Sequence, residues 1–160
     1  MFQRKSKSIT PEVALQKLQS YCAYQERCHQ EVAAKLYEFG IVGDTADAVV
    51  AQLIEDDFLN EERFAVSYAR GKFRIKSWGK IRIRQGLKQH RIPDYSIQRA
   101  MEAVDTEGSY LEVLQKVLEK KAPDYADDPQ RKSKLAAYGI SRGFESDLVW
   151  EVLKTFQAWT

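Results

Sequence analysis

Histidine and cysteine are scarce in this sequence of 160 residues, with two of each. Cys22, Cys28 and His29 lie close together, but their spacing is not that of a zinc site and no second ligand pair follows. Two cysteines form no disulfide framework and suit a reducing compartment, so we expect ordinary packed or surface thiols. His29 and His90 are far apart in the sequence, and neither stands beside a nucleophile motif. We therefore expect no metal and no catalytic residues.

Glycine and proline are also few, at eight and four residues, and no apolar run approaches the length of a membrane-spanning helix. No apolar segment of signal-peptide length follows the basic N-terminus. Gly79-Lys80 is followed by Ile81 rather than by Ser or Thr, which excludes the usual phosphate-binding loop. These absences predict an α-rich, folded protein of the cytoplasm. We expect it to be no enzyme and to take no cofactor, no small-molecule substrate and no membrane.

An apolar pattern occurs three times along the chain. Apolar residues at i, i+3, i+4 and i+7 predict one helix face, and successive copies lie 51 and then 52 residues apart. A further apolar residue stands five positions before each copy: Ile41, Ile92 or Phe144. This near-constant period indicates a tandem array of helical units. The copies are Ala46, Val49, Val50 and Leu53; Ile97, Ala100, Met101 and Val104; and Val149, Val152, Leu153 and Phe156.

Each unit has room for two further helices before the repeated one. We expect them at 11–22 and 28–39, at 60–76 and 79–90, and at 107–121 and 129–142. Gly40 and Gly143 stand where a left-handed residue closes a helix, and residues 122–129 are expected to form a loop. The predicted fold is all-α: three tandem three-helix repeats forming an elongated, curved array. The predicted domains are a basic tail, 1–9, and repeats 10–57, 58–105 and 106–160.

One stretch of the middle unit is ambiguous. Residues 73–84 alternate apolar and basic side chains around Trp78-Gly79, as a β-hairpin would. The repeat favours a helix from 79 to 90 instead, and an isolated hairpin is at best marginally stable. We adopt the helix, with the hairpin as the alternative.

The basic residues are concentrated in one segment. Residues 63–93 hold ten Lys or Arg and no Asp or Glu, whereas the other 15 basic and 23 acidic residues leave the rest of the chain at a net charge of −8. Such a segment creates a local positive field that attracts polyanions or acidic protein surfaces. We infer from charge that these ten residues bind a partner or DNA: Arg63, Arg70, Lys72, Arg74, Lys76, Lys80, Arg82, Arg84, Lys88 and Arg91.

The spacing of these basic residues places them on different sides of the two predicted helices. Arg63, Arg70 and Arg74 share the side of the 60–76 helix opposite its apolar face, whereas Lys72 lies on the apolar side with its amine expected to extend outward. Three interpretations remain open: a solvated helix face, a nucleic-acid surface with aromatic stacking, and a surface for an acidic or DNA-bearing partner. The second helix places four cations along one ridge: Lys80, Arg84, Lys88 and Arg91.

The segments around the basic residues resemble the RecX family. The central signature is Phe58 to Ala65, reading Phe-Leu-Asn-Glu-Glu-Arg-Phe-Ala, followed by Tyr68, Lys72-Phe73 and Trp78-Gly79-Lys80-Ile81-Arg82. Residues 27–40 resemble the family's first unit and residues 138–144 its last. Glu61 departs from the family's usual Asp, Cys28 from a capping Ser and Gly139 from Leu. The glycine is expected to weaken its helix by about 1 kcal/mol relative to alanine and to lose packing.

This resemblance implies a regulatory protein of three three-helix repeats. Members of the family bind the recombinase RecA, lodge in the groove of its nucleoprotein filament and restrain recombination in DNA repair and the SOS response. The implied partner is therefore the RecA filament, with single- or double-stranded DNA as a further one, and the implied effect is mainly inhibition of recombination and ATPase activity. A RecA-independent helical DNA-binding module is the alternative. The resemblance identifies no individual contact residues.

Overall fold

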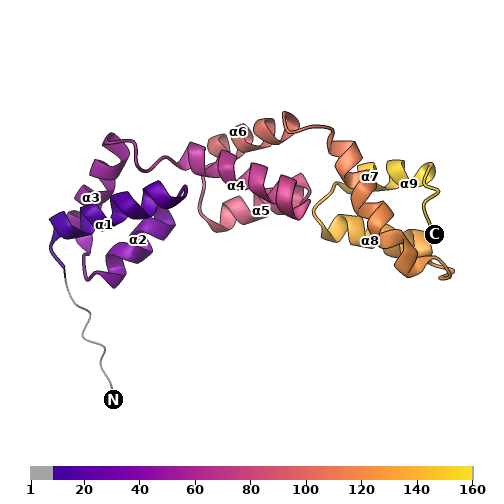
Figure 1. Ribbon diagram of the computed structural model, residues 1–160, viewed down its shortest axis with the longest axis horizontal. Helices are drawn as coiled ribbons and strands as arrows, with labels where there is room; N and C mark the ends of the chain where they lie inside the picture. The colour runs from indigo at the N-terminus through magenta and orange to yellow at the C-terminus, as the bar shows by residue number, and fades with distance from the viewer. Residues whose placement is uncertain (1–8, 160) are drawn as a thin grey trace, which may run out of the picture. The chain divides into compact units, whose positions relative to one another are not determined.

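The computed structural model describes residues 9–159, which leaves all of the predicted basic tail but Ile9 outside the described residues. The chain divides into two compact units, and the first extends through Phe64 and includes His90–Ile92. Its helices are α1 (Pro11–Tyr24), α2 (His29–Glu38) and α3 (Gly43–Glu55) (Figure 1). The Thr10 hydroxyl caps α1 by accepting a hydrogen bond from the Val13 amide at 3.2 Å, and Pro11 begins the helix.

The second unit holds Ala65–Gln89 and the chain from Pro93 onward. Its helices are α4 (Glu61–Lys76), whose first turn belongs to the first unit, α5 (Lys80–Gln89), α6 (Asp94–Asp105), α7 (Tyr110–Lys121), α8 (Arg131–Ser141) and α9 (Ser146–Lys154). The predicted 79–90 helix is confirmed as α5, and the hairpin alternative is wrong. The predicted loop at 122–129 is partly wrong, because Ala122–Tyr125 form a 3₁₀-helix (η1) that continues α7 and buries Ala122.

The apolar pattern builds the cores, as its period predicted. Val49 and Leu53 of α3 are buried in the core of the first unit, and Val149 and Leu153 of α9 in a core of the second. All four residues of the copy on α6 are buried. The residues five positions before each copy are buried as well, where the chain turns into the third helix of each group: Ile41, Ile92 and Phe144. The described chain is thus all-helical and built from groups of three helices; the repeat boundaries stay a prediction.

Gly139 lies inside α8, where the sequence led us to expect a loss of packing. A Cβ at this position would lie 3.1 Å from Leu118 Cδ2 and 3.2 Å from Val149 Cγ2. Because α8 approaches α7 and α9 this closely, the missing side chain leaves no cavity and the expected loss of packing is not found. The lower helix propensity of glycine remains a cost.

Tyr110 contacts α4, the start of α5 and the residues just before α9, all within the second unit. Its hydroxyl accepts a hydrogen bond from the Lys80 amide at 2.9 Å and donates one to Glu145 Oε1 at 3.0 Å. Its ring centroid lies 5.9 Å from that of Phe73 and 5.3 Å from that of Phe144. Burial raises the pKa of Tyr110 above its ordinary value. The tyrosine thereby fixes the start of α5, the helix that carries the candidate cations.

Candidate partner-binding surface

Glu107 forms ion pairs with two of the predicted contact residues. Its side chain is only 8% exposed, and Arg70 Nε lies 2.8 Å from its Oε1 while Arg74 pairs with its Oε2. Arg70 and Arg74 are one turn apart on α4, so that one carboxylate reaches both. Helical phase correctly placed the two arginines on one side of α4. An acid from outside the basic segment lies against that side and compensates their charge.

Trp78 holds two more of the predicted cations. Lys72 Nζ lies 4.8 Å from the ring centroid, and Arg82 Cζ lies 4.2 Å from it. Lys72 Nζ also lies 5.4 Å from the Tyr68 ring. Both cations are half-buried, and a cation over an aromatic face gains roughly 0.5–1 kcal/mol at such sites. Trp78, an aromatic residue within the basic segment, therefore already contacts two of the chain's own cations.

Lys80 begins α5 and turns toward the end of α6. Its amine pairs with Asp105 Oδ1 and lies 4.9 Å from the centroid of the Tyr110 ring. The charge of Lys80, the first residue of the predicted ridge, is thus compensated by Asp105, a second acid that lies outside the basic segment.

Arg63 has a structural role within the first unit. Its Nε lies 2.6 Å from Glu26 Oε1, its Nη1 lies 3.1 Å from Asp57 Oδ1, and its Nη2 donates to the Asp57 carbonyl at 3.0 Å. The hydrogen bond to Glu26 is the largest cause of a pKa of Arg63 that is raised above its ordinary value. These contacts fasten the start of α4 to the residues that follow α1 and α3.

Four of the ten predicted residues are both exposed and unpaired in the described part of the chain. Lys76 ends α4, Arg84 and Lys88 lie on α5, and Arg91 follows α5 with a φ of 57°. Within residues 9–159 none of these four side chains has an ion-pair or hydrogen-bond partner. Arg84 and Lys88 are four residues apart and therefore share one face of α5. The uncompensated basic residues of this segment are therefore fewer than the ten that were counted in the sequence.

Sequence reasoning missed residues of both signs. Asp105 and Glu107 lie outside the basic segment, so counting charge along the chain could not reveal that they compensate it. Lys116 and Lys120 of α7 were also missed, although their spacing of four residues predicts one helix face. Both lysines line a cleft together with the end of α4.

The described residues give little support for a metal site, a membrane-spanning helix or a reactive thiol. Among residues 9–159, no three His, Cys, Asp or Glu side chains gather in a way that could hold a metal ion. None of the helices there combines the length and the apolar character needed to cross a bilayer. Cys22 and Cys28 are free, buried thiols, and desolvation raises the pKa of Cys28 to about 11.

Two family models match the chain. Residues 60–101 match the second three-helix domain of RecX, and residues 109–153 match the third. The first match spans α4, α5 and most of α6, which carry the cations described above. The second spans all of α7 and α8 and nearly all of α9.

Curated relatives and solved structures agree with these matches. The chain is 28% identical over 140 residues to the regulatory protein RecX of Prosthecochloris aestuarii, covering 88% of this chain and 91% of the relative. It is 27% identical over 132 residues to that of Bacillus mycoides, covering 81% of this chain but 48% of the relative. The crystal structure of RecX from Lactobacillus salivarius superposes with a TM-score of 0.77 at 23% identity, over 90% of this chain and 94% of that one. This chain belongs to the RecX family of regulatory proteins.

Proposed function

We propose that this chain is a cytoplasmic regulator that binds the RecA recombinase on its nucleoprotein filament and inhibits recombination and ATPase activity. The observation that carries the proposal is the pair Arg84 and Lys88, exposed and uncompensated on α5 in the middle repeat of a RecX-family chain. A filament of protein on DNA offers carboxylates and phosphates, and both accept strong charge-assisted hydrogen bonds from such cations.

The compensated cations have a different role in this proposal. Arg70, Arg74 and Lys80 hold the end of α6 and the residues after it against α4 and α5 through Glu107 and Asp105. They position the helix that presents the contact residues and contribute less to binding directly. Lys76 of the second unit and Arg91 of the first unit are also exposed, and we include both among the proposed contact residues.

A strand-exchange and ATPase assay with RecA tests the proposal. The unmodified chain should inhibit both activities, and the double variant Arg84→Glu with Lys88→Glu should lose most of that inhibition. The matched control is Lys132→Glu with Lys154→Glu, which makes the same charge change at exposed positions on α8 and α9. The proposal fails if the unmodified chain leaves both activities unchanged. Equal inhibition by the two double variants would remove α5 from the contact.

A RecA-independent DNA-binding module is the second candidate. It is favoured by the same uncompensated pair, since two cations on one helix face can contact successive phosphates. Counterion release predicts that the logarithm of affinity falls with the logarithm of salt concentration, by about 0.9 for each phosphate contacted on duplex DNA. Tight, salt-dependent DNA binding without any effect on RecA supports this candidate. Absence of DNA binding at low salt excludes it.

A further inference from the structure

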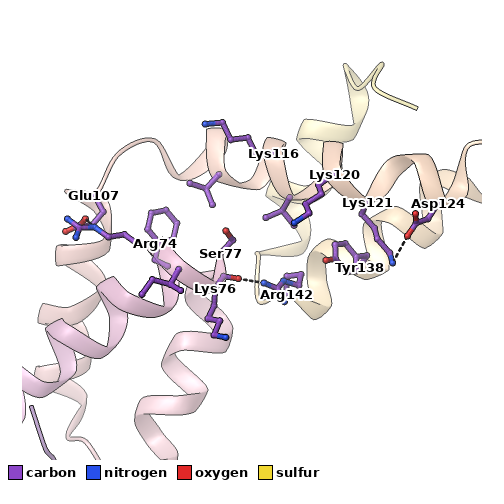
Figure 2. A pocket seen from close by; sticks show the side chains of 14 residues that line it. Arg74, Lys76, Ser77, Glu107, Lys116, Lys120, Lys121, Asp124, Tyr138 and Arg142 are labelled. Carbon is purple, nitrogen blue, oxygen red and sulfur yellow. Dashed lines mark hydrogen bonds and ion pairs between the residues drawn. The ribbon is translucent and has the colours of Figure 1, made fainter. Parts of the chain in front are cut away.

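A cationic cleft lies in the second unit between the end of α4, α7 and α8. It has a volume of about 800 Å³, and Figure 2 shows the side chains that line it. Lys76, Lys116 and Lys120 line it, and no carboxylate among the described residues pairs with these three amines. The two acids of the cleft are already engaged, because Glu107 receives Arg70 and Arg74 and Asp124 pairs with Lys121 at 2.9 Å. The cleft therefore has cationic groups in excess.

Arg142 adds hydrogen-bond donors to this cleft. Its Nη2 donates to the carbonyl of Lys76, which is the dashed contact in Figure 2. Its Nε is buried and has no partner among the described residues. A guanidinium carries five N–H donors, and a buried donor without an acceptor is unfavourable. A small turn of the Arg142 side chain toward an anion in the cleft would relieve this unpaired donor.

The apolar lining distinguishes between classes of anion. Ile75 lines the cleft with 80% of its surface exposed, beside the half-buried Val113 and Val117. Single-stranded nucleic acids favour open aromatic faces for stacking. Here Phe73 is only 2% exposed, and the Lys121 amine lies 5.1 Å from the Tyr138 ring centroid. Aliphatic side chains between cations match a polypeptide that alternates acidic and aliphatic residues better than they match a sugar-phosphate backbone.

We propose that this cleft binds an acidic segment of a partner protein. Carboxylates of the segment pair with Lys120 and Arg142, and an aliphatic side chain of the segment packs on Ile75. The site is separate from the α5 pair on which the proposed function rests. The acidic and aliphatic character of the segment defines the ligand of the cleft, so the partner need not be the recombinase.

Binding of a fluorescent peptide that alternates Glu and Leu tests this site on the full chain. Lys120→Glu should weaken binding by about tenfold, as expected for loss of one charge-assisted hydrogen bond. Lys132→Glu, an equal charge change on α8 outside the cleft, should leave it nearly unchanged. Ile75→Ser should weaken binding of the Glu-Leu peptide but not of a Glu-Ser peptide of the same charge. Ile75 is so exposed that this substitution leaves the fold intact.

Three outcomes would overturn the proposal. The first is no peptide binding at low salt, and the second is equal weakening by Lys120→Glu and Lys132→Glu. The third is displacement of the peptide by oligo-dT together with no effect of Ile75→Ser, which would make the cleft a nucleic-acid site. The variant Arg84→Glu with Lys88→Glu separates this proposal from the proposed function. It should keep most of its peptide binding while losing inhibition of RecA.

Discussion

The backbone of Gly79 lies directly against the backbone of Gly143. The Gly79 amide donates to the Arg142 carbonyl at 2.8 Å, and the Ile81 amide donates to the Gly143 carbonyl at 3.0 Å. A Cβ at Gly79 would lie 2.2 Å from the carbonyl carbon of Gly143. Gly143 itself has a φ of 98°, which side chains disfavour. Two glycines thus allow the start of α5 and the end of α8 to join through backbone hydrogen bonds.

Replacing Gly79 by alanine should destabilise the second unit. The added methyl group meets backbone atoms that cannot move aside, and overpacking of this kind costs about 1–3 kcal/mol. Gly71→Ala is the matched control, because Gly71 lies inside α4 and an added Cβ there would meet no neighbouring atom within 4 Å outside its own helix backbone. That change should stabilise the chain by roughly 0.5–1 kcal/mol through helix propensity. Urea unfolding measures both variants, and equal midpoints would contradict the close contact of Gly79.

Glu107→Gln should increase the affinity of the chain for polyanions. The change removes the charge that Arg70 and Arg74 share and releases two guanidinium groups on α4. Both arginines are about half exposed or more, so the loss of stability should stay below about 2 kcal/mol. Elution from heparin should shift to higher salt. Glu151→Gln, an equal charge change at an exposed position of α9, should shift it less. The explanation is wrong if both variants elute together.

Arg63 and Arg84 should give opposite results when each is replaced by alanine. Arg63→Ala removes hydrogen bonds to Glu26 and Asp57, and charged hydrogen bonds of this kind contribute about 2 kcal/mol. It should lower stability and leave polyanion binding almost unchanged. Arg84→Ala should change stability by less than about 0.5 kcal/mol and weaken polyanion binding. Unfolding and heparin elution, measured on both variants, provide the comparison. A loss of binding in Arg63→Ala without a loss of stability would contradict the structural role of Arg63.

The chain should lose stability at alkaline pH because of Cys28. Burial raises the pKa of this thiol from about 9 to about 11 in the folded chain. Between these values the folded state binds more protons than the unfolded state, so the contribution is complete below pH 9 and falls as pH rises toward 11. Cys28→Ser removes the titrating thiol and keeps a capping residue before α2. Its free energy of unfolding should fall less between pH 9 and pH 11 than that of the unmodified chain.

The sequence by itself determined the helical architecture. An apolar spacing of three and four residues fixes which side of a helix enters a core, and its recurrence at Val49, Ala100 and Val152 located three equivalent helices. The glycines at positions 40 and 143 predicted two helix ends, and both have a positive φ. These features depend on residues near one another in the chain, and local backbone preferences are therefore enough to predict them.

The tertiary structure alone decided which cations remain available to a partner. Charge counting treated Arg74 and Arg84 alike, but Arg74 pairs with the carboxylate of Glu107, 33 residues further along the chain, while Arg84 has no ion-pair partner among the described residues. The same holds for the cleft, since no local pattern reveals that α7 brings Lys120 beside the end of α4. Coulomb interactions depend on distance in space and on exposure to water. Periodicity can therefore predict the helices, whereas only their packing sets the surface charge.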